Sequence, residues 1–168
     1  IRAIRLAENR GQSTALLVGL RASRYDVVAT IDGDLQNDPR ELPCLMALLG
    51  EADMVCGIRR KRQDSIWRRL VSRGANRLRS RLTGDGITDT CCSLKVLTGQ
   101  VADTLPFFHG ALAQLNGFRV TETGVSHRPR VQGETKYGSW GRLKATVPDL
   151  LGFLWLKSRY PRYVAEEM

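Results

Sequence analysis

The sequence has few cysteines and histidines, and none of them are spaced as metal ligands usually are. Its four cysteines, Cys44, Cys56, Cys91 and Cys92, form no Cys-x-x-Cys pair, and neither histidine lies near them in sequence. A structural zinc site and a disulfide framework are therefore both disfavoured, and reduced cytosolic thiols fit this pattern best. The chain also has no apolar run of about 18 residues, the length that a helix needs to span a bilayer.

Acidic residues are also scarce relative to basic ones. The 168 residues include 26 Lys and Arg against 17 Asp and Glu, which gives a net charge of +9. Residues 59–81 alone hold ten Lys or Arg and one acid, Asp64. This excess implies an anionic partner, such as nucleic acid, a phosphorylated substrate or an acidic membrane surface. Nucleic acid is not expected, because Trp67 is the only aromatic residue there and RNA-binding sheets need exposed aromatics for stacking.

The hydrophobic content of 42% and the length suit one globular domain with a core of its own. The pattern predicts strands at 1–7, 26–31, 52–58, 93–97 and 118–127, and helices at 14–23, after Pro39, and at 65–82. Residues 26–31 (DVVATI) are typical of a buried strand, and Gly124 of a bulge. Strand, helix and strand in this order predict parallel α/β architecture, in which ligands bind at the carboxyl ends of strands.

An acidic loop follows the predicted strand 26–31. Asp32 and Asp34 are two residues apart at the strand end, where both carboxylates can turn toward one point, and Gln36 adds a neutral oxygen. Hard oxygen ligands suit Mg²⁺ or Mn²⁺, and a site with open positions can bind a substrate diphosphate through the metal. The alternative is a simple turn, since Asp and Gly favour turns anyway.

The basic stretch contains a second set of candidate residues. Arg68 and Ser72 lie four apart, on one face of the predicted helix, and Arg59 directly follows the strand predicted at 52–58. Guanidinium groups bind phosphate oxygens in pairs, and a hydroxyl can add another hydrogen bond. The alternative for any single arginine is a solvated surface. A cluster of ten cations repels itself unless an anion is near, which favours a phosphate along this helix.

Two further groups are weaker signals. Asp89 lies just before a predicted strand and can face the same crevice as Asp34, where it could accept a proton from an incoming acceptor substrate. The alternative is that Asp89 simply forms an Asx-turn. Arg130 and Lys136, with Gly133 between them, can clamp a second anion. Cys91 and Cys92 are poor nucleophile candidates, because only Lys95 is nearby to lower a thiol pKa.

Six segments, taken in order, resemble family 2 glycosyltransferases of the dolichol-phosphate-mannose-synthase type. They are NRGQSTAL at 9–16, DGDLQNDP at 32–39, ADMVCGIR at 52–59, RLVSRGANRL at 69–78, DTCCSLKVL at 89–97 and HRPRVQGETKYG at 127–138. Together they run along nearly the whole chain. The resemblance implies a GT-A-type, Rossmann-like fold with a mixed, mostly parallel sheet flanked by helices. It also implies inverting transfer of a sugar from a nucleotide-sugar donor to a polyprenyl (dolichyl or undecaprenyl) phosphate.

The resemblance assigns roles to individual residues. Asp34 and Gln36 would hold Mg²⁺ or Mn²⁺, and Asp32 would line the same site. The phosphates of donor and acceptor would be bound by Arg59, Arg68, Ser72, Arg130 and Lys136, and Asp89 and Arg68 would act at the reaction centre. An acceptor phosphate is already ionised and needs little help from a base. Catalysis would then consist mainly of positioning and of charge neutralisation on the leaving diphosphate.

The expected organisation is a partial catalytic domain at 1–139 and an amphipathic helical segment at 140–168. The family's opening strands, with V-P-x-Y-N-E and D-D-G-S, are not in this sequence, a helical turn or two is missing after Gly110, and Cys91 stands where glycine is common. We expect the functional protein to be longer at its amino terminus, and to be cytoplasmic and peripheral at the inner face of an anionic membrane. The alternatives are a non-catalytic basic module that binds membrane or nucleic acid, and an inactive relative of the family.

Overall fold

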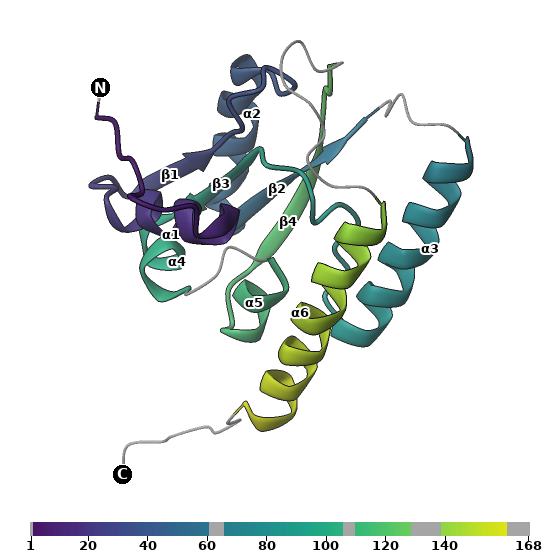
Figure 1. The fold of residues 1–168 in the computed structure, drawn as a ribbon. Coiled ribbons are helices and arrows are strands. Elements are labelled where there is room, and N and C mark those ends of the chain that lie inside the picture. The colour runs from purple at the N-terminus through teal and green to yellow at the C-terminus, as the bar shows by residue number, and fades with distance from the viewer. Residues whose placement is uncertain (1, 61–65, 106–109, 129–138, 161–168) are drawn as a thin grey trace.

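The computed structural model describes residues 2–60, 66–105, 110–128 and 139–160, and in 66–73 and 139–146 the backbone only (Figure 1). Its centre is a sheet with the order β1-β3-β2-β4. The strands are β1 (Val27–Thr30), β2 (Met54–Arg59), β3 (Lys95–Thr98) and β4 (Val120–Val125). These runs are rich in β-branched residues, which pack well on a pleated surface.

The strand directions bring one end of several strands together. β3 is antiparallel to both β1 and β2, and β4 is parallel to β2. β1, β2 and β4 therefore run the same way, and the predicted mixed, mostly parallel sheet is confirmed in strand direction. Because β3 lies between β1 and β2, β2–β4 is the one parallel pair among the described strands. We call the edge where β1, β2 and β4 end, and where β3 begins, the carboxyl edge.

Different helices cover the two faces of the sheet (Figure 1). They are α1 (Gly11–Arg21), α2 (Leu42–Met46) between the 3₁₀ turns η1 (Pro39–Glu41) and η2 (Ala47–Gly50), α3 (Ile66–Thr83), α4 (Gly99–Thr104), α5 (Gly110–Leu115) and α6 (Ser139–Arg159). Met54 and Cys56 share one core cluster with α1, α4 and α5, and Val55 shares another with α2. This alternation follows from the period of two in a strand.

The helices α3 and α6 lie side by side at one flank (Figure 1). Lys157 Nζ on α6 donates to the carbonyl oxygen of Thr83 at 2.6 Å, at the carboxyl end of α3. Tyr160 donates from its hydroxyl to Asn116 Oδ1 at 2.7 Å, just after α5. α6 falls on the predicted helical segment at 140–168, and its end is bound to the body of the protein by these two contacts.

Three expectations about strands were wrong. Residues 2–10 form neither strand nor helix, although their alternation predicted a strand at 1–7. The strand at 26–31 was expected to be buried, yet Val27 and Ile31 are each 40% exposed. β1 is exposed because it lies at an end of the described sheet and pairs only with β3 there. Gly124 forms no bulge, since it stands opposite Ile58 in an unbroken register.

Candidate functional site

The loop after β1 has an unusual backbone. Asp34 Oδ1 accepts a hydrogen bond from the backbone N–H of Gln36 at 3.2 Å, an Asx-turn. The residue between them, Leu35, has φ 63°, in the left-handed region that a leucine rarely occupies. Asp34 and Gln36 are half-buried and Asp32 is exposed. The turn expected as the alternative is thus present, and it brings the two predicted metal ligands to either side of a strained residue.

The loop is fixed from the far side by the segment after β4. Arg128 donates its backbone N–H to the Gln36 carbonyl at 2.8 Å, and Gln36 Nε2 donates to the Arg128 carbonyl at 3.3 Å. Asp38, which caps η1, accepts hydrogen bonds from the side chains of Arg40 and Arg128. The hydrogen bonds from Arg40 and the charge of Arg128 hold the pKa of Asp38 well below its usual range. The carboxylate therefore stays ionised well into the acid range, where its ion pairs with Arg40 and Arg128 persist.

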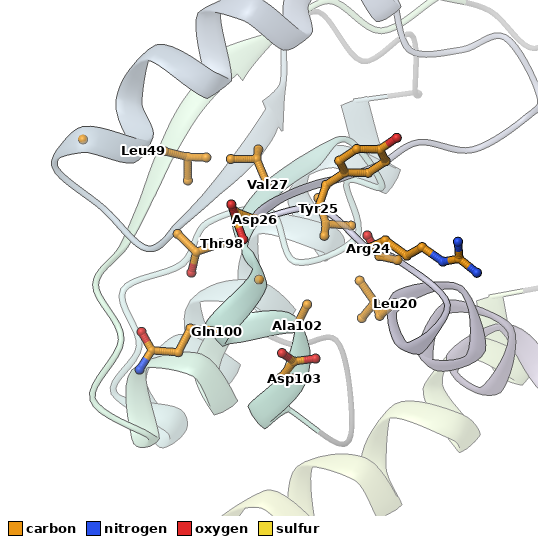
Figure 2. A pocket seen from close by; sticks show the side chains of 14 residues that line it. Leu20, Arg24, Tyr25, Asp26, Val27, Leu49, Thr98, Gln100, Ala102 and Asp103 are labelled. Atoms are coloured by element: carbon orange, nitrogen blue, oxygen red, sulfur yellow. The ribbon is translucent and has the colours of Figure 1, made fainter.

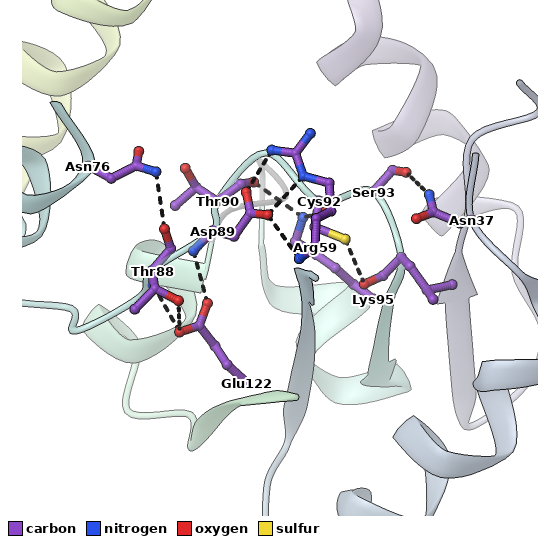
Figure 3. Close-up of polar contacts among 11 residues, drawn as sticks. Asn37, Arg59, Asn76, Thr88, Asp89, Thr90, Cys92, Ser93, Lys95 and Glu122 are labelled. Carbon is purple, nitrogen blue, oxygen red and sulfur yellow. Dashed lines mark hydrogen bonds and ion pairs between the residues drawn. The ribbon is translucent and has the colours of Figure 1, made fainter. Parts of the chain in front are cut away.

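Asp89 forms a buried ion pair with the end of β2 (Figure 3). Arg59 donates to it from Nε and from Nη2, each at 2.8 Å, and from its backbone N–H at 3.2 Å. The two side chains are 15% and 7% exposed. A two-point pair with this geometry fixes the plane of the guanidinium group, which suits it to present a further N–H to a phosphate. Two residues that the sequence analysis assigned to different groups are thus direct partners.

Further contacts hold the segment 88–95 against both neighbouring strands (Figure 3). Glu122 on β4 accepts from the backbone N–H groups of Thr88 and Asp89 at 2.9 and 3.1 Å. Lys95, itself 5% exposed, donates from Nζ to the carbonyls of Cys92 and Thr90. Neither residue was among the predicted site residues. A lone acid in a strand was the only signal for Glu122, and it says nothing about which loop the side chain meets.

The Asp89 segment is also tied to the acidic loop. Thr30, the last residue of β1, donates its hydroxyl to the Ser93 carbonyl at 2.7 Å. Asn37 Nδ2 donates to Ser93 Oγ at 2.8 Å, and Asn37 is 6% exposed. The acidic loop, the Arg59–Asp89 pair and the segment after β4 therefore meet at the carboxyl edge, where the strand order predicts ligands to bind.

Four predicted site residues lie outside what the structure describes in atomic detail. Arg68 and Ser72 are on α3, whose backbone is described there but whose side chains are not. Arg130 and Lys136 lie outside the described residues altogether. Among the five that are described, Arg59 contacts Asp89, Asp34 contacts Gln36 through its backbone, and Asp32 lies in the same loop.

A divalent metal site is compatible with the acidic loop but needs more than protein ligands. Within the described ranges, no three His, Cys, Asp or Glu side chains gather as a ready-made metal cluster. Mg²⁺ is commonly bound through one or two carboxylates together with substrate phosphates. Asp34 and Gln36 offer hard oxygen atoms of that type on a loop whose backbone is fixed. The residues therefore fit a metal that binds together with a diphosphate.

A cavity of about 790 Å³ lies at the other end of the sheet, and its lining includes Asp26, Val27, Thr98 and Asp103 (Figure 2). It opens at the start of β1 and the end of β3, away from the carboxyl edge. None of the predicted site residues lines it. Volume alone therefore does not locate the site, and the carboxyl edge remains the candidate.

Comparison with known proteins gives three findings. The family model described as "Glycosyl transferase family 2" matches residues 1–105. The chain is 33% identical to the dodecaprenyl-phosphate galacturonate synthase of Rhizobium johnstonii, with 92% of the chain and 48% of that protein covered. It is 40% identical to the undecaprenyl-phosphate 4-deoxy-4-formamido-L-arabinose transferase of Pseudomonas fluorescens, with 89% and 46% covered. The chain thus spans about half the length of the curated relatives it matches.

Solved structures show the same fold at low identity. Glucosyl-3-phosphoglycerate synthase from Mycobacterium tuberculosis, in complex with phosphoglyceric acid, superposes with a TM-score of 0.64 at 17% identity. The alignment covers 94% of this chain and 58% of that one. The same enzyme, solved with Mn²⁺, uridine diphosphate and its product, gives a TM-score of 0.63. The expected GT-A-type fold is thereby confirmed.

Proposed function

Since the chain belongs to glycosyl transferase family 2, we propose that it forms part of an enzyme that moves a sugar from a nucleotide-sugar donor to a polyprenyl phosphate. The main support for this proposal is the topology of the sheet, which brings three loops that are far apart in sequence together at the carboxyl edge. Each loop brings groups suited to phosphate or metal. The names of the two relatives, both prenyl-phosphate sugar transferases, support this choice of acceptor. The donor sugar is left open.

The reaction would be a single displacement at the anomeric carbon. An acceptor phosphate oxygen attacks that carbon, a new carbon–oxygen bond forms on the face opposite the donor, and the bond to the nucleoside diphosphate breaks. The configuration inverts, and the electron pair leaves with the diphosphate. Because the acceptor oxygen is already ionised, the protein contributes mainly position and charge.

The chain's own residues divide this work. Asp89 fixes Arg59 through Nε and Nη2, and we assign the third nitrogen, Nη1, to a phosphate oxygen. Arg68, Ser72, Arg130 and Lys136 are assigned to the same phosphates on the basis of the family resemblance. Asp34 and Gln36, with Asp32 beside them, would hold Mg²⁺ or Mn²⁺. When bound, such an ion neutralises charge on the leaving diphosphate.

A membrane surface is the proposed site of action, because the acceptor is a lipid. Val147, Leu151 and Trp155 lie four residues apart on α6 and are 46%, 62% and 62% exposed. The Arg159 guanidinium lies 5.6 Å from the centre of the Trp155 ring. An exposed apolar stripe with cations beside it suits a helix that lies in a lipid headgroup layer. No helix in the described ranges has the length and apolar character needed to cross a membrane.

A transfer assay tests the function. The complete coding sequence around this chain would be expressed, since the chain covers about half of its relatives. The protein is incubated with undecaprenyl phosphate, Mn²⁺ and a panel of radiolabelled nucleotide sugars, and label in the lipid phase is counted. We expect transfer from one donor, and loss of transfer in EDTA. Vesicle or nucleic-acid binding without transfer from any donor would instead support the non-catalytic basic module.

A further inference from the structure

Within the described residues, the hydrogen bonds of the Glu122 carboxylate go to one short segment, residues 88 and 89. Glu122 lies on β4, directly opposite Cys56 of β2 in the parallel register. Oε2 accepts from the Thr88 backbone N–H and from the Thr88 hydroxyl, each at 2.9 Å. Oε1 accepts from the Asp89 backbone N–H at 3.1 Å. Both oxygens of one side chain thus hold the main chain of residues 88 and 89 (Figure 3).

The same segment is held from its other side by Arg59. Asp89 therefore has its backbone N–H on Glu122 and its carboxylate on Arg59, with bonds of 3.1 Å and 2.8 Å. The two anchors come from adjacent strands, because β2 pairs with β4 along its whole length. Moving the Glu122 carboxylate would shift the Asp89 main chain, and the Arg59 guanidinium plane would move with it.

The chemistry of Glu122 explains why a carboxylate is needed there. An ionised carboxylate only accepts hydrogen bonds, and each of its three partners is a donor. Glutamine has nearly the same shape, but its NH₂ would face an N–H or O–H donor at one of the two positions. Aspartate keeps both acceptors and is one methylene shorter. Glutamine should therefore fail because it brings a donor where an acceptor is needed, and aspartate because its side chain is too short.

We infer that Glu122 is a positioning residue for sugar transfer, which acts through Asp89 to set the orientation of Arg59. This inference rests on the proposed function for its kinetic part. A displacement of reacting groups by about 1 Å can cost about a hundredfold in rate. Glu122 lies on β4, and its hydrogen bonds go to Thr88 and Asp89 rather than to the acidic loop. Its loss should therefore lower kcat and leave metal binding unchanged.

A double-mutant cycle on the complete enzyme tests the inference. Glu122→Gln should lower kcat about 10- to 100-fold with little change in KM for the donor. Asp89→Asn should cost as much or more, and the double variant should be no worse than Asp89→Asn alone. Glu51→Gln, the same chemical change at an exposed position, is the matched control and should leave kcat unchanged. Additive losses in the double variant would overturn the inference.

A second readout separates this inference from the proposed function. In the 168-residue chain, the Arg59 Nε–H resonance reports its hydrogen bond to Asp89 by NMR. It should shift in Glu122→Gln and stay in place in Glu51→Gln, whether or not any sugar is transferred. An unchanged Arg59 resonance would show that Glu122 does not act through Asp89. A shifted resonance in a protein with no transferase activity would keep the structural coupling and reject the enzyme assignment alone.

Discussion

Leu35 lies between the two proposed metal ligands in a conformation that costs on the order of 1–3 kcal/mol for a residue with a side chain. The surrounding contacts must outweigh that cost. The two Gln36–Arg128 hydrogen bonds and the Asp38 contacts lie just after it in the chain. Strain kept in this way limits the conformations of the loop, and it favours a role for the loop beyond connecting β1 to η1.

Asp34→Asn should abolish most metal-dependent diphosphate binding without unfolding the protein. Even groups that only orient a metal ligand are worth about 10- to 100-fold in metal affinity, so a ligand itself should cost at least that much. Asparagine keeps an Oδ1 atom that can accept the Gln36 N–H, so the Asx-turn is retained and the protein should stay folded. Calorimetric titration with Mn²⁺ and pyrophosphate, beside a thermal melt, measures both effects.

Asp26→Asn is the control for that experiment. It makes the same change at an exposed position at the opposite end of β1. Mn²⁺-dependent binding should be as in the unsubstituted protein. If Asp34→Asn and Asp26→Asn behave alike, the metal assignment is wrong.

The four cysteines should divide into two reactive and two inert thiols. Cys44 and Cys91 are exposed, whereas Cys56 and Cys92 are buried. Burial raises the pKa of Cys56 to about 12 and also raises that of Cys92. The thiolate is the nucleophile, so at pH 8 both buried thiols stay protonated. Iodoacetamide should add two labels to the native protein and four to the unfolded one, by mass spectrometry, and three or more native labels would contradict the burial.

Among the elements, β2 leaves little room for change at Gly57. A Cβ atom on Gly57 would lie 2.9 Å from the Leu94 carbonyl oxygen, 2.9 Å from Val125 Cγ2 and 3.0 Å from Cys92 Sγ. One of these neighbours is backbone, so it cannot move aside cheaply. Overpacking of this kind costs about 1–3 kcal/mol.

Gly57→Ala should therefore lower the free energy of unfolding by about 1–3 kcal/mol, as measured by urea denaturation. Gly50→Ala is the matched control, because no atom lies within 4 Å of a Cβ placed there. It should change stability by less than about 0.5 kcal/mol. Equal stability of the two variants would mean that β2, β3 and β4 are not packed as described.

The stripe on α6 should bind anionic vesicles. Trp155→Ser removes a ring that is 62% exposed, and Arg159→Gln removes the cation above it. Each should reduce co-sedimentation with vesicles that contain phosphatidylglycerol. Tyr25→Ser, which removes an aromatic ring 82% exposed near the start of β1, should not. Binding that is absent at low salt would show that this face of α6 is only the outer side of a packed helix.

The positions of several helices and strands along the chain could be predicted from the sequence, but the contacts between them could not. The helix after Pro39, α3 and α6 lie where capping residues, periodicity and apolar content predicted them. Residues 2–10 form no strand, although apolar and polar residues alternate there, because a strand also needs a neighbouring strand to pair with. Asp32, Asp34, Gln36, Arg59 and Asp89 were predicted as site residues from residue type and position, and the structure places them at the carboxyl edge. The Arg59–Asp89 and Glu122–Asp89 contacts were missed, since they depend on which strands become neighbours.

For the molecule as a whole, the outer side of β1 is the most consequential surface. Val27 and Ile31 are each 40% exposed, and β1 pairs with β3 on one side within the described residues. An open strand edge with apolar side chains is a template for pairing with another strand. A strand of a second copy of this chain would be one such partner.

The 168-residue chain should therefore self-associate as its concentration rises. Val27→Lys places a charge on the edge and should shift the equilibrium toward monomer, as sedimentation velocity can show. Val147→Lys removes a similarly exposed valine from α6 and is the control. If both variants reduce association equally, the effect comes from added charge in general and the β1 edge is not its specific cause.

The burial of residues 26–31 and the direction of β3 could not be predicted from the sequence, because both depend on position in the sheet. The run at 26–31 has the composition of a buried strand, and its described pairing partner lies about 70 residues further along the chain. No local pattern distinguishes β3, which runs against its neighbours, from a strand that runs with them. Direction is set by connections and packing over the whole molecule.

The place of β3 also fixes the order in which the sheet can assemble. β1 and β2 leave the ribosome first, yet they are not neighbours, and each pairs with β3. Until Lys95–Thr98 has been synthesised, β1 has no described partner, and β2 must wait for β3 or for β4 still later. Pairings over such sequence separations are slow, because loop closure comes before any gain from contacts. Among the described strands, β1 and β2 thus remain without their shared partner until β3 has been synthesised, and a chaperone would be most needed in that period.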